Sequence, residues 1–473
     1  MNQLLQDGLN RLFADSSETP DWQQVAAVTS VRNNLSIISG GPGTGKTSTV
    51  VRVLALVLEQ YKDREKKLQV ALAAPTGKAA ARLQDSIVSA KEELNVTDEI
   101  REAIPEKAQT LHQLLGARRY SSQFKHNADN PVPYDLVVVD EASMVDQALM
   151  SKLVEALLED ARLILLGDKD QLASVEAGSV LGDICDMEGN QYSRDYADWL
   201  NALSFDISDK FVFNEDKPLT NNITLLTKSY RFSSDSGIAR LSKEVNKGDA
   251  GRTISLLESA DINDITFEDI GDSSQLESLL DEKIPTYFQN ILDADTPREA
   301  VSKLNQFGIL AAHRKGPWGI LHLNKVVEKI LQAHSLIPKY NQWYSGKPVI
   351  INTNDYTLGL FNGDTGVCLP DQNGELKVYF ENEGEVRGIA PSRLPNHNTA
   401  YALTVHKSQG SEIDEVMLVL PRTVSKVVNR ELLYTAITRA RNKVIIAGKR
   451  SVLKKGIQRK ISRSSGLRDY LWS

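Results

Sequence analysis

The sequence predicts an α/β protein with two domains, each built on a parallel sheet with helices on both faces, and a small insertion in each domain. Three observations lead to this prediction. Short, nearly continuous apolar runs alternate with helix-length periodic segments, which is typical of parallel sheets covered on both faces. The alternation occurs twice, and stretches rich in turn residues interrupt it. At 473 residues, the chain is also too long for one core of ordinary size.

The first domain is expected at residues 35–222, after an N-terminal helical segment at 1–34. Its predicted strands are the apolar runs in QVALAAPT, DLVVVDEAS and ARLILLGD, and its predicted helices include GKAAARLQDSIVSA and ALMSKLVEALL. Residues 116–134 interrupt this pattern with RRYSSQFKHN, bounded by PVP, and we expect a hairpin there.

The second domain is expected in two parts, with an insertion between them. Residues 223–336 resume the alternation with ITLLTKSYRF and GIARLSKEVNKG. Residues 337–399 contain short β-type runs separated by Asn-Gly and Gly-Asp turn signals, which predict a small β-barrel. Residues 400–473 close the domain with EVMLVLP, ELLYTAITRA and NKVIIAGK, and end in a basic tail.

Composition excludes several classes of protein. No apolar run approaches the roughly 18 to 20 residues that span a bilayer, so no membrane partner is expected. Cys185 and Cys368 are too few for a disulfide framework or a zinc site, which suits a reducing cytoplasm. The net charge of −7 argues against nucleic-acid binding over the whole surface. The eleven Lys and Arg residues from Arg439 onward indicate a local groove, or else a solvated helix face.

The segment ISGGPGTGKT, residues 38–47, lies between an apolar strand and an apolar-periodic helix. Its glycines allow consecutive backbone N–H groups to surround an anion, while Lys46 reaches the β- and γ-phosphates and the Thr47 hydroxyl holds Mg²⁺. A nucleoside triphosphate, ATP, is therefore expected here with Mg²⁺ as its metal. The expected binding residues are Gly40, Gly41, Pro42, Gly43, Thr44, Gly45, Lys46 and Thr47.

Polar residues after two further strands complete the expected chemistry. Asp140 and Glu141 follow an apolar strand, so their carboxylates belong at the carboxyl edge of the sheet beside the phosphate loop. Asp140 is the expected Mg²⁺ partner and Glu141 the expected base for water. Gln171 follows the next strand, where an amide can sense the γ-phosphate, although an ordinary turn also fits. Gln23, ahead of the first strand, offers adenine a paired donor and acceptor.

Arg231 in SYRF and Arg439 in ITRAR both lie in the expected second domain. Phosphoryl transfer develops charge that an arginine finger neutralises, with an effect of roughly 10³ to 10⁵ on the rate. If both arginines point at the γ-phosphate, ATP lies between the domains and closes them. Either arginine alone also fits a surface ion pair.

Eight motifs in order carry a family resemblance: GGPGTGKT, APTGKAAARL, QTLHQLLG, VVVDEAS, LLGDKDQL, KSYRF, LTVHKSQGSE and YTAITRAR. From about residue 20 onward, the chain resembles superfamily 1 helicases. It is most similar to the branch of the RecD subunits, the α subunits of the RecBCD enzyme (exodeoxyribonuclease V). The resemblance implies two RecA-like P-loop NTPase domains.

The resemblance also implies residue roles. Gln23 is assigned to adenine, Tyr230 to base stacking and Glu412 to a contact on the nucleotide side. Lys46, Asp140 and Glu141 remain catalytic residues, and Gln171, Arg231 and Arg439 become γ-phosphate sensors. Single-stranded DNA is expected against Pro75, Thr76, His112, Thr404 and His406, although the two histidines also fit a structural role. The 116–134 hairpin is expected to split the duplex, and the 337–399 barrel to wall the DNA channel.

The implied function is an ATP-dependent DNA helicase that moves 5′ to 3′ on single-stranded DNA from duplex ends. It is expected to act in double-strand break repair and recombination, with RecB and RecC as partners in a bacterial cytoplasm. RecD subunits usually carry a sizeable N-terminal domain, whereas about twenty residues precede Trp22 here. The chain is therefore expected to be trimmed or a shortened member of the family, which puts docking on RecC in doubt.

Three alternatives stay open from the sequence. The alternatives to the implied function are a stand-alone helicase of the same branch, an ATP-switched regulatory subunit that unwinds nothing, and an RNA helicase of the same superfamily. No nuclease centre is expected, because no further acidic or His-rich cluster has metal-binding spacing.

Overall fold

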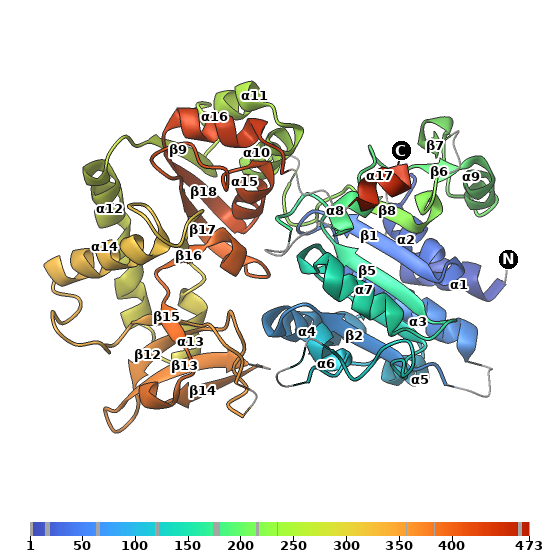
Figure 1. Cartoon of the computed structure of the whole chain (residues 1–473), viewed down its shortest axis with the longest axis horizontal. Coiled ribbons are helices and arrows are strands. Elements are labelled where there is room, and N and C mark those ends of the chain that lie inside the picture. Colours follow the sequence, from blue (N-terminus) through green and yellow to red (C-terminus); the bar gives the residue numbers. More distant parts are fainter. Residues whose placement is uncertain are drawn as a thin grey trace. The chain divides into compact units, whose positions relative to one another are not determined.

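The computed structural model describes residues 3–14, 19–62, 67–118, 121, 123–173, 180–213, 217–233, 235–355, 357–382, 384–461 and 466–472. The chain forms two compact units, residues 1–231 with 463–473, and residues 232–462 (Figure 1). Each unit contains its own parallel sheet, so the predicted fold class is confirmed.

The first unit contains a six-stranded parallel sheet in the order β3-β2-β4-β5-β1-β8. The strands are apolar on both faces because neighbouring side chains enter different cores: Ile38 and Val138 join one cluster, Ile37 and Val137 the other. The strands are β1 (Leu35–Gly40), β2 (Val70–Ala74), β3 (Ala108–Thr110), β4 (Leu136–Val139), β5 (Arg162–Gly167) and β8 (Ile223–Leu226). A separate parallel pair consists of β6 (Tyr192–Ser193) and β7 (Val212–Phe213).

Helices cover both faces of this sheet, as Figure 1 shows for the first unit. One core includes α1 (Gln3–Leu12), α2 (Trp22–Arg32), α3 (Lys46–Tyr61), α4 (Gly77–Glu92), α5 (Asp98–Ala103) and α9 (Arg194–Asn201). The opposite core includes α6 (Leu111–Leu114), α7 (Gln147–Glu155), α8 (Val180–Ile184) and the C-terminal α17 (Leu467–Trp472). Short 3₁₀ turns are η1 (Ala142–Met144), η2 (Asp209–Phe211) and η3 (Thr220–Asn222).

The second unit contains a five-stranded parallel sheet in the order β16-β10-β17-β18-β9. The strands are β9 (Ile265–Asp269), β10 (Phe307–Ala311), β16 (Ala402–Thr404), β17 (Ile413–Val419) and β18 (Ala440–Gly448). Two helices, α12 (Ser273–Leu292) and α14 (Ile320–Ala333), share one core with β10, β16, β17 and β18. The other helices are α10 (Gly237–Lys247), α11 (Ala250–Leu257), α13 (Pro297–Lys303), α15 (Arg430–Ile437) and α16 (Arg450–Gln458).

The insertion in the second unit is an antiparallel sheet in the order β14-β13-β12-β11-β15. Its strands are β11 (Pro348–Ile351), β12 (Thr365–Pro370), β13 (Leu376–Asn382), β14 (Glu385–Ile389) and β15 (His397–Thr399), with η4 (Pro391–Arg393) before the last. We expected a small β-barrel. Among the described residues the edge strands β14 and β15 do not pair, so the sheet is open. Strand β15 is short because the chain turns after Thr399 to enter β16 of the parallel sheet.

The structure differs from the sequence-based expectation at both junctions between the domains. Residues 223–226 were expected to begin the second domain, yet β8 pairs with β1 in the first sheet. The end of the chain was expected to remain with the second domain, yet α17 packs on α8 of the first unit. There Trp472 Nε1 donates to the Asp183 carbonyl oxygen at 3.0 Å, and Leu471 is buried. Apolar runs predict that a segment is buried but not which core receives it.

The described part of the region at 116–134 contains isolated bridges instead of regular strands. Ala117 pairs with Phe124, and Asn127 with Asn130, both in the antiparallel sense. Positions 119, 120 and 122 of the expected hairpin lie outside the described residues. The bridged segment returns on itself, in keeping with a hairpin-like turn, but no strand ladder is assigned to the part that is described.

Candidate functional site

The phosphate loop connects β1 to α3 within the first unit. Gly43 and Gly45 have φ values of 75° and 79°, which glycine adopts without the steric cost that other residues meet. Lys46, the first residue of α3, folds its ammonium group back over the loop. Its Nζ donates to the carbonyl oxygens of Gly40 at 2.7 Å and Gly41 at 3.1 Å. The expected glycines and lysine therefore form one compact loop at the start of a helix.

Close packing around the loop leaves no space for side chains at its left-handed positions. A Cβ at Gly43 would lie 2.3 Å from Arg231 Cβ, and one at Gly45 would lie 2.4 Å from Gln23 Nε2. The bare backbone at these positions fits a loop that must approach phosphate oxygens closely. Gln23 and Arg231, far apart in sequence, both lie against the loop.

The KSYRF motif reaches the phosphate loop because β8 lies beside β1. The Tyr230 backbone N–H donates to the Gly43 carbonyl oxygen at 2.7 Å, and the Ser229 hydroxyl donates to that of Pro42 at 3.3 Å. The Tyr230 ring remains 62% exposed, and Lys228 Nζ lies 5.2 Å from its centroid. An exposed ring fixed at the loop is available for stacking on a base.

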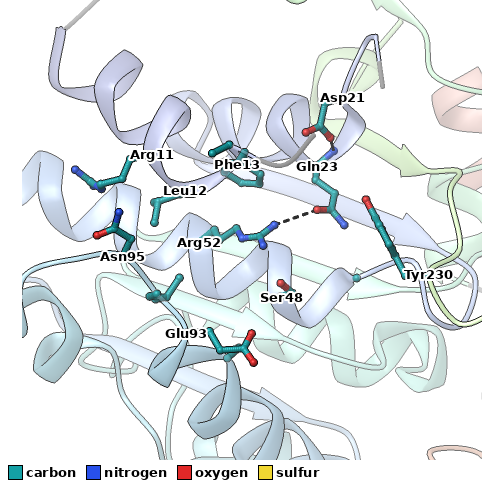
Figure 2. A pocket seen from close by; sticks show the side chains of 14 residues that line it. Arg11, Leu12, Phe13, Asp21, Gln23, Ser48, Arg52, Glu93, Asn95 and Tyr230 are labelled. Carbon is teal, nitrogen blue, oxygen red and sulfur yellow. Dashed lines mark hydrogen bonds between the residues drawn. The ribbon is translucent and has the colours of Figure 1, made fainter. Parts of the chain in front are cut away.

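A cavity of about 500 Å³ lies beside the loop and includes Gln23, Gly45 and Tyr230 in its lining (Figure 2). Asp21 caps α2 by accepting from the Gln23 backbone N–H at 2.8 Å, which places the glutamine in the first turn. Gln23 Nε2 donates to the Thr44 carbonyl oxygen at 3.1 Å. Gln23 and Tyr230, the candidates for adenine recognition and base stacking, thus line the same cavity. The remaining lining residues are Arg11, Leu12, Phe13, Ala14, Asp21, Ser48, Arg52, Ala90, Glu93, Leu94 and Asn95.

Asp140 and Glu141 follow β4 at the carboxyl edge of the first sheet. Asp140 Oδ1 accepts from the Glu141 backbone N–H at 2.8 Å, and Glu141 adopts a left-handed φ of 51°. Burial, and next the charge of Glu141, raises the pKa of Asp140 to about 6, while Lys46 and Arg82 oppose the shift. Binding of a proton or a metal ion to the Asp140 carboxylate is therefore favoured.

Gln171 lies after β5, the strand between β4 and β1. Its Nε2 donates to Asp168 Oδ2 at 3.1 Å, and Asp168 Oδ1 accepts from the Asp170 N–H at 3.1 Å. Gln171 is only 6% exposed, and its Oε1 has no hydrogen-bond partner among the described residues. A buried acceptor without a partner is costly unless a ligand or water satisfies it. This oxygen is suited to accept from the attacking water.

The candidate DNA contacts of the first unit follow two adjacent strands. Pro75 and Thr76 come directly after β2, and His112 lies in α6 after β3, with Ala74 and Thr110 paired at the strand ends. The Thr76 hydroxyl caps α4 by accepting from Ala79 N–H at 3.2 Å. His112 is exposed, and its ring meets Phe124 edge-on at 5.7 Å. The three residues thus share one edge of the sheet.

The second unit contains the remaining candidates. Arg439 is 3% exposed, and it donates from Nε to the Thr435 carbonyl oxygen and from Nη1 to that of Ser411, both at 3.3 Å. Glu412 forms an ion pair with Arg441 at 2.8 Å. Thr404 ends β16, and His406 lies in η5 (Val405–Ser408), where the Thr404 hydroxyl accepts from the Lys407 N–H. Backbone carbonyl oxygens of its own unit therefore hold Arg439, whereas a side-chain ion pair holds Glu412.

Arg52 lines the cavity and was not among the sequence-based candidates. Arg52 Nη1 donates to Gln23 Oε1 at 3.2 Å, as the dashed line in Figure 2 shows. Arg52 is the only charged residue between Val50 and Leu58. A lone charge in this otherwise apolar stretch of the helix was the signal that could have indicated a role.

The described residues offer no group of three or more His, Cys, Asp and Glu suited to hold a metal ion. Thr47 and Asp140 remain the candidate ligands for Mg²⁺, and hydroxyl and carboxylate oxygens are the donors that this ion prefers. No helix among the described residues is both long and apolar enough to cross a membrane.

Comparisons with known proteins show which proteins this chain is similar to. Residues 23–177 match a family model described as an AAA domain, and residues 399–447 match the UvrD-like helicase C-terminal domain. The RecBCD enzyme subunit RecD of Haemophilus influenzae is 38% identical over 97% of this chain and 73% of that protein. The ATP-dependent RecD2 DNA helicase of Deinococcus radiodurans is 30% identical over 89% of this chain and 47% of that protein. The Pif1 helicase of Candida albicans, a solved structure, is 14% identical with a TM-score of 0.45, and covers 99% of this chain and 98% of that one.

Proposed function

We propose that ATP hydrolysis drives the movement of this chain along DNA. The chain belongs to the family of RecD subunits of the RecBCD enzyme. The chain is a superfamily 1 DNA helicase. We infer that it translocates 5′ to 3′ on single-stranded DNA from duplex ends, as a partner of RecB and RecC in double-strand break repair and recombination in the bacterial cytoplasm. The observation that carries the mechanism is the hydrogen bond between Tyr230 and Gly43, because it joins a helicase motif to the phosphate loop.

The phosphate loop and the acids after β4 supply the hydrolytic chemistry. Lys46 binds the β- and γ-phosphates, and the Thr47 hydroxyl with the Asp140 carboxylate would hold Mg²⁺. When bound, Mg²⁺ neutralises charge on the phosphate oxygens. Glu141 accepts a proton from the attacking water, and Gln171 Oε1, which has no partner among the described residues, orients that water.

Two arginines complete the proposed site. Arg231 lies beside Gly43 in the first unit, so a shift of the loop on γ-phosphate release moves the KSYRF segment directly. We propose that Arg439, which belongs to the second unit, also acts on the γ-phosphate and lowers the barrier to transfer. Tyr230 stacks on the base, and Glu412 contributes on the nucleotide side.

The DNA path uses residues from both units. Pro75, Thr76 and His112 contact single-stranded DNA from the first unit, and Thr404 and His406 from the second, mostly at its phosphates. We assign the 116–134 segment to strand separation and the antiparallel insertion to the wall of the DNA channel. The second candidate is a stand-alone helicase of the same branch; the Deinococcus relative is named an ATP-dependent DNA helicase.

The test measures ATP hydrolysis with and without single-stranded DNA for the wild type, Arg439→Ala and Arg439→Lys. Arg439→Ala should lower DNA-stimulated turnover by about 10³-fold while DNA affinity stays within a few-fold. Lysine should rescue little, because it lacks the planar guanidinium. The matched control is Arg450→Ala, since Arg450 forms a surface ion pair with Glu258. If single-stranded DNA does not stimulate ATP hydrolysis by the wild type, the chain would instead be an ATP-switched regulatory subunit.

A further inference from the structure

The cavity beside the phosphate loop contains a side-chain relay that leads from the N-terminal helix to Gln23. Figure 2 shows Arg52 and Gln23 joined by a hydrogen bond, with the Tyr230 ring on the other side of Gln23. Arg52 projects from α3, the helix that begins at the phosphate loop, so its position is tied to that of the loop. The hydrogen bond between Arg52 and Gln23 lies within the first unit. All residues that line the cavity belong to this unit and are described by the structure.

Two contacts fix the orientation of the Gln23 amide. Its Oε1 accepts from Arg52 Nη1 at 3.2 Å, and its Nε2 donates to the Thr44 carbonyl oxygen at 3.1 Å. A 180° flip of the amide would set its NH₂ group against a guanidinium, which only donates, and its oxygen against a carbonyl, which only accepts. Arg52 and Thr44 therefore permit one orientation, in which the amide still has one lone pair and one N–H for a ligand.

This orientation decides which purine the site can recognise. An amide that presents an acceptor beside a donor matches the N6 amino group and N7 of adenine, whereas two donors, such as those of arginine, match O6 and N7 of guanine. We propose that Arg52 is a positioning residue that makes the site selective for adenine over guanine nucleotides, because it locks the amide of Gln23. The inference rests on the proposed nucleotide site and names how that site selects its substrate.

Arg52 is itself held by the N-terminal helix segment. Its guanidinium lies over the Phe13 ring, 5.0 Å from the centroid, and Phe13 is only 5% exposed. The segment is anchored to α3, where Arg11 pairs with Glu59 at 2.5 Å and Gly8 allows close contact with Leu56. Removal of the aromatic face at residue 13 should therefore loosen Arg52 and weaken the same selectivity.

The experiment compares ATP and GTP as substrates for the wild type, Arg52→Met and Arg52→Lys, with single-stranded DNA present. Arg52→Met should raise KM for ATP, leave kcat near the wild-type value, and lower the ATP-to-GTP ratio of kcat/KM by about tenfold. Arg52→Lys should restore most of the ratio, since an ammonium group also donates to Gln23 Oε1. Phe13→Leu, which keeps the apolar volume, should give a smaller loss in the same direction.

The control is Arg32→Met, since Arg32 also lies over aromatic rings, those of Tyr196 at 4.8 Å and Trp199 at 4.0 Å. It should leave the ATP-to-GTP ratio unchanged. If the wild type is active and Arg52→Met changes KM for both nucleotides equally, or changes KM for neither, the role of Arg52 is overturned. The proposed function then still stands. A wild type that hydrolyses neither nucleotide would overturn the proposed function together with this inference. Thermal unfolding of each variant separates these outcomes from a loss of fold.

Discussion

The Tyr230 backbone N–H donates to the Gly43 carbonyl oxygen at 2.7 Å, so a segment 187 positions away in sequence is fixed to the phosphate loop. The pairing of β8 with β1 makes this contact possible. Any change of the loop on nucleotide binding or release is therefore transmitted to Tyr230 and Arg231 through the backbone itself.

The first prediction concerns Gly43→Ala. The new Cβ would lie 2.3 Å from Arg231 Cβ, and the left-handed φ of 75° adds strain, so the KSYRF segment must move away from the loop. ATP turnover should fall by about a hundredfold, because misplaced groups at a phosphoryl-transfer site lose rate steeply. Steady-state ATPase measurements with single-stranded DNA check this value.

Gly189→Ala is the control that separates the effect of backbone strain from that of steric contact with Arg231. Gly189 has a similar φ of 82°, but nothing lies within 4 Å of a Cβ built there. The substitution should cost about 1 kcal/mol of folding stability and leave ATPase activity intact. Equal loss of activity in both variants would mean that backbone strain, and not contact with Arg231, explains the effect at Gly43.

The second prediction concerns pH. Because burial raises the pKa of Asp140 to about 6, the folded protein holds a proton there more tightly than the unfolded chain does. The buried charge therefore destabilises the protein at pH 7.5, and this penalty disappears as pH falls through 6 toward the unfolded pKa of about 4. Asp140→Asn should thus raise the thermal midpoint at pH 7.5 but not at pH 4, while it abolishes hydrolysis.

The pH dependence of ATP hydrolysis by the wild type tests the same assignment of Asp140. Metal-dependent hydrolysis requires the Asp140 carboxylate, so kcat/KM for ATP should fall below a pH of about 6. A profile that stays flat down to pH 5, or an Asp140→Asn variant less stable than the wild type at pH 7.5, would contradict the assignment.

The third prediction concerns the C-terminal helix α17. Leu471 is 5% exposed in the core of the first unit, whereas the adjacent Tyr470 is 80% exposed. Leu471→Ala should weaken docking of the helix by about 2 kcal/mol, while Tyr470→Ala should change it by no more than about 0.5 kcal/mol. Limited proteolysis should then release the C-terminus faster only in Leu471→Ala. Equal release from both variants would show that burial of Leu471 does not hold the helix.

The sequence predicted best those features that depend on residues close together in the chain. The phosphate loop, the acids after β4 and the two parallel sheets follow from spacing and local apolar patterns. It failed for β8 and α17, because a short, mostly apolar run such as Ile223–Leu226 is compatible with either core. The choice depends on pairing with β1, which no local pattern encodes.

The antiparallel insertion and Arg52 illustrate two further limits. Turn signals located the strands of the insertion, yet they do not determine whether edge strands such as β14 and β15 meet. Arg52 belongs to none of the recognised motifs, and its partner Gln23 lies 29 positions earlier. Such relationships appear only when helices α2 and α3 are packed together.

The most direct test is strand displacement with a duplex that has either a 5′ or a 3′ single-stranded tail, measured for the wild type and Lys46→Ala. Lys46 Nζ lies on the phosphate loop, 2.7 Å from the Gly40 carbonyl oxygen, and it is expected to bind the phosphates during every cycle. The wild type should unwind the 5′-tailed duplex in an ATP-dependent manner and leave the 3′-tailed one intact, while Lys46→Ala unwinds neither. Unwinding by Lys46→Ala, or a wild type that prefers the 3′ tail, would contradict ATP-driven 5′-to-3′ movement.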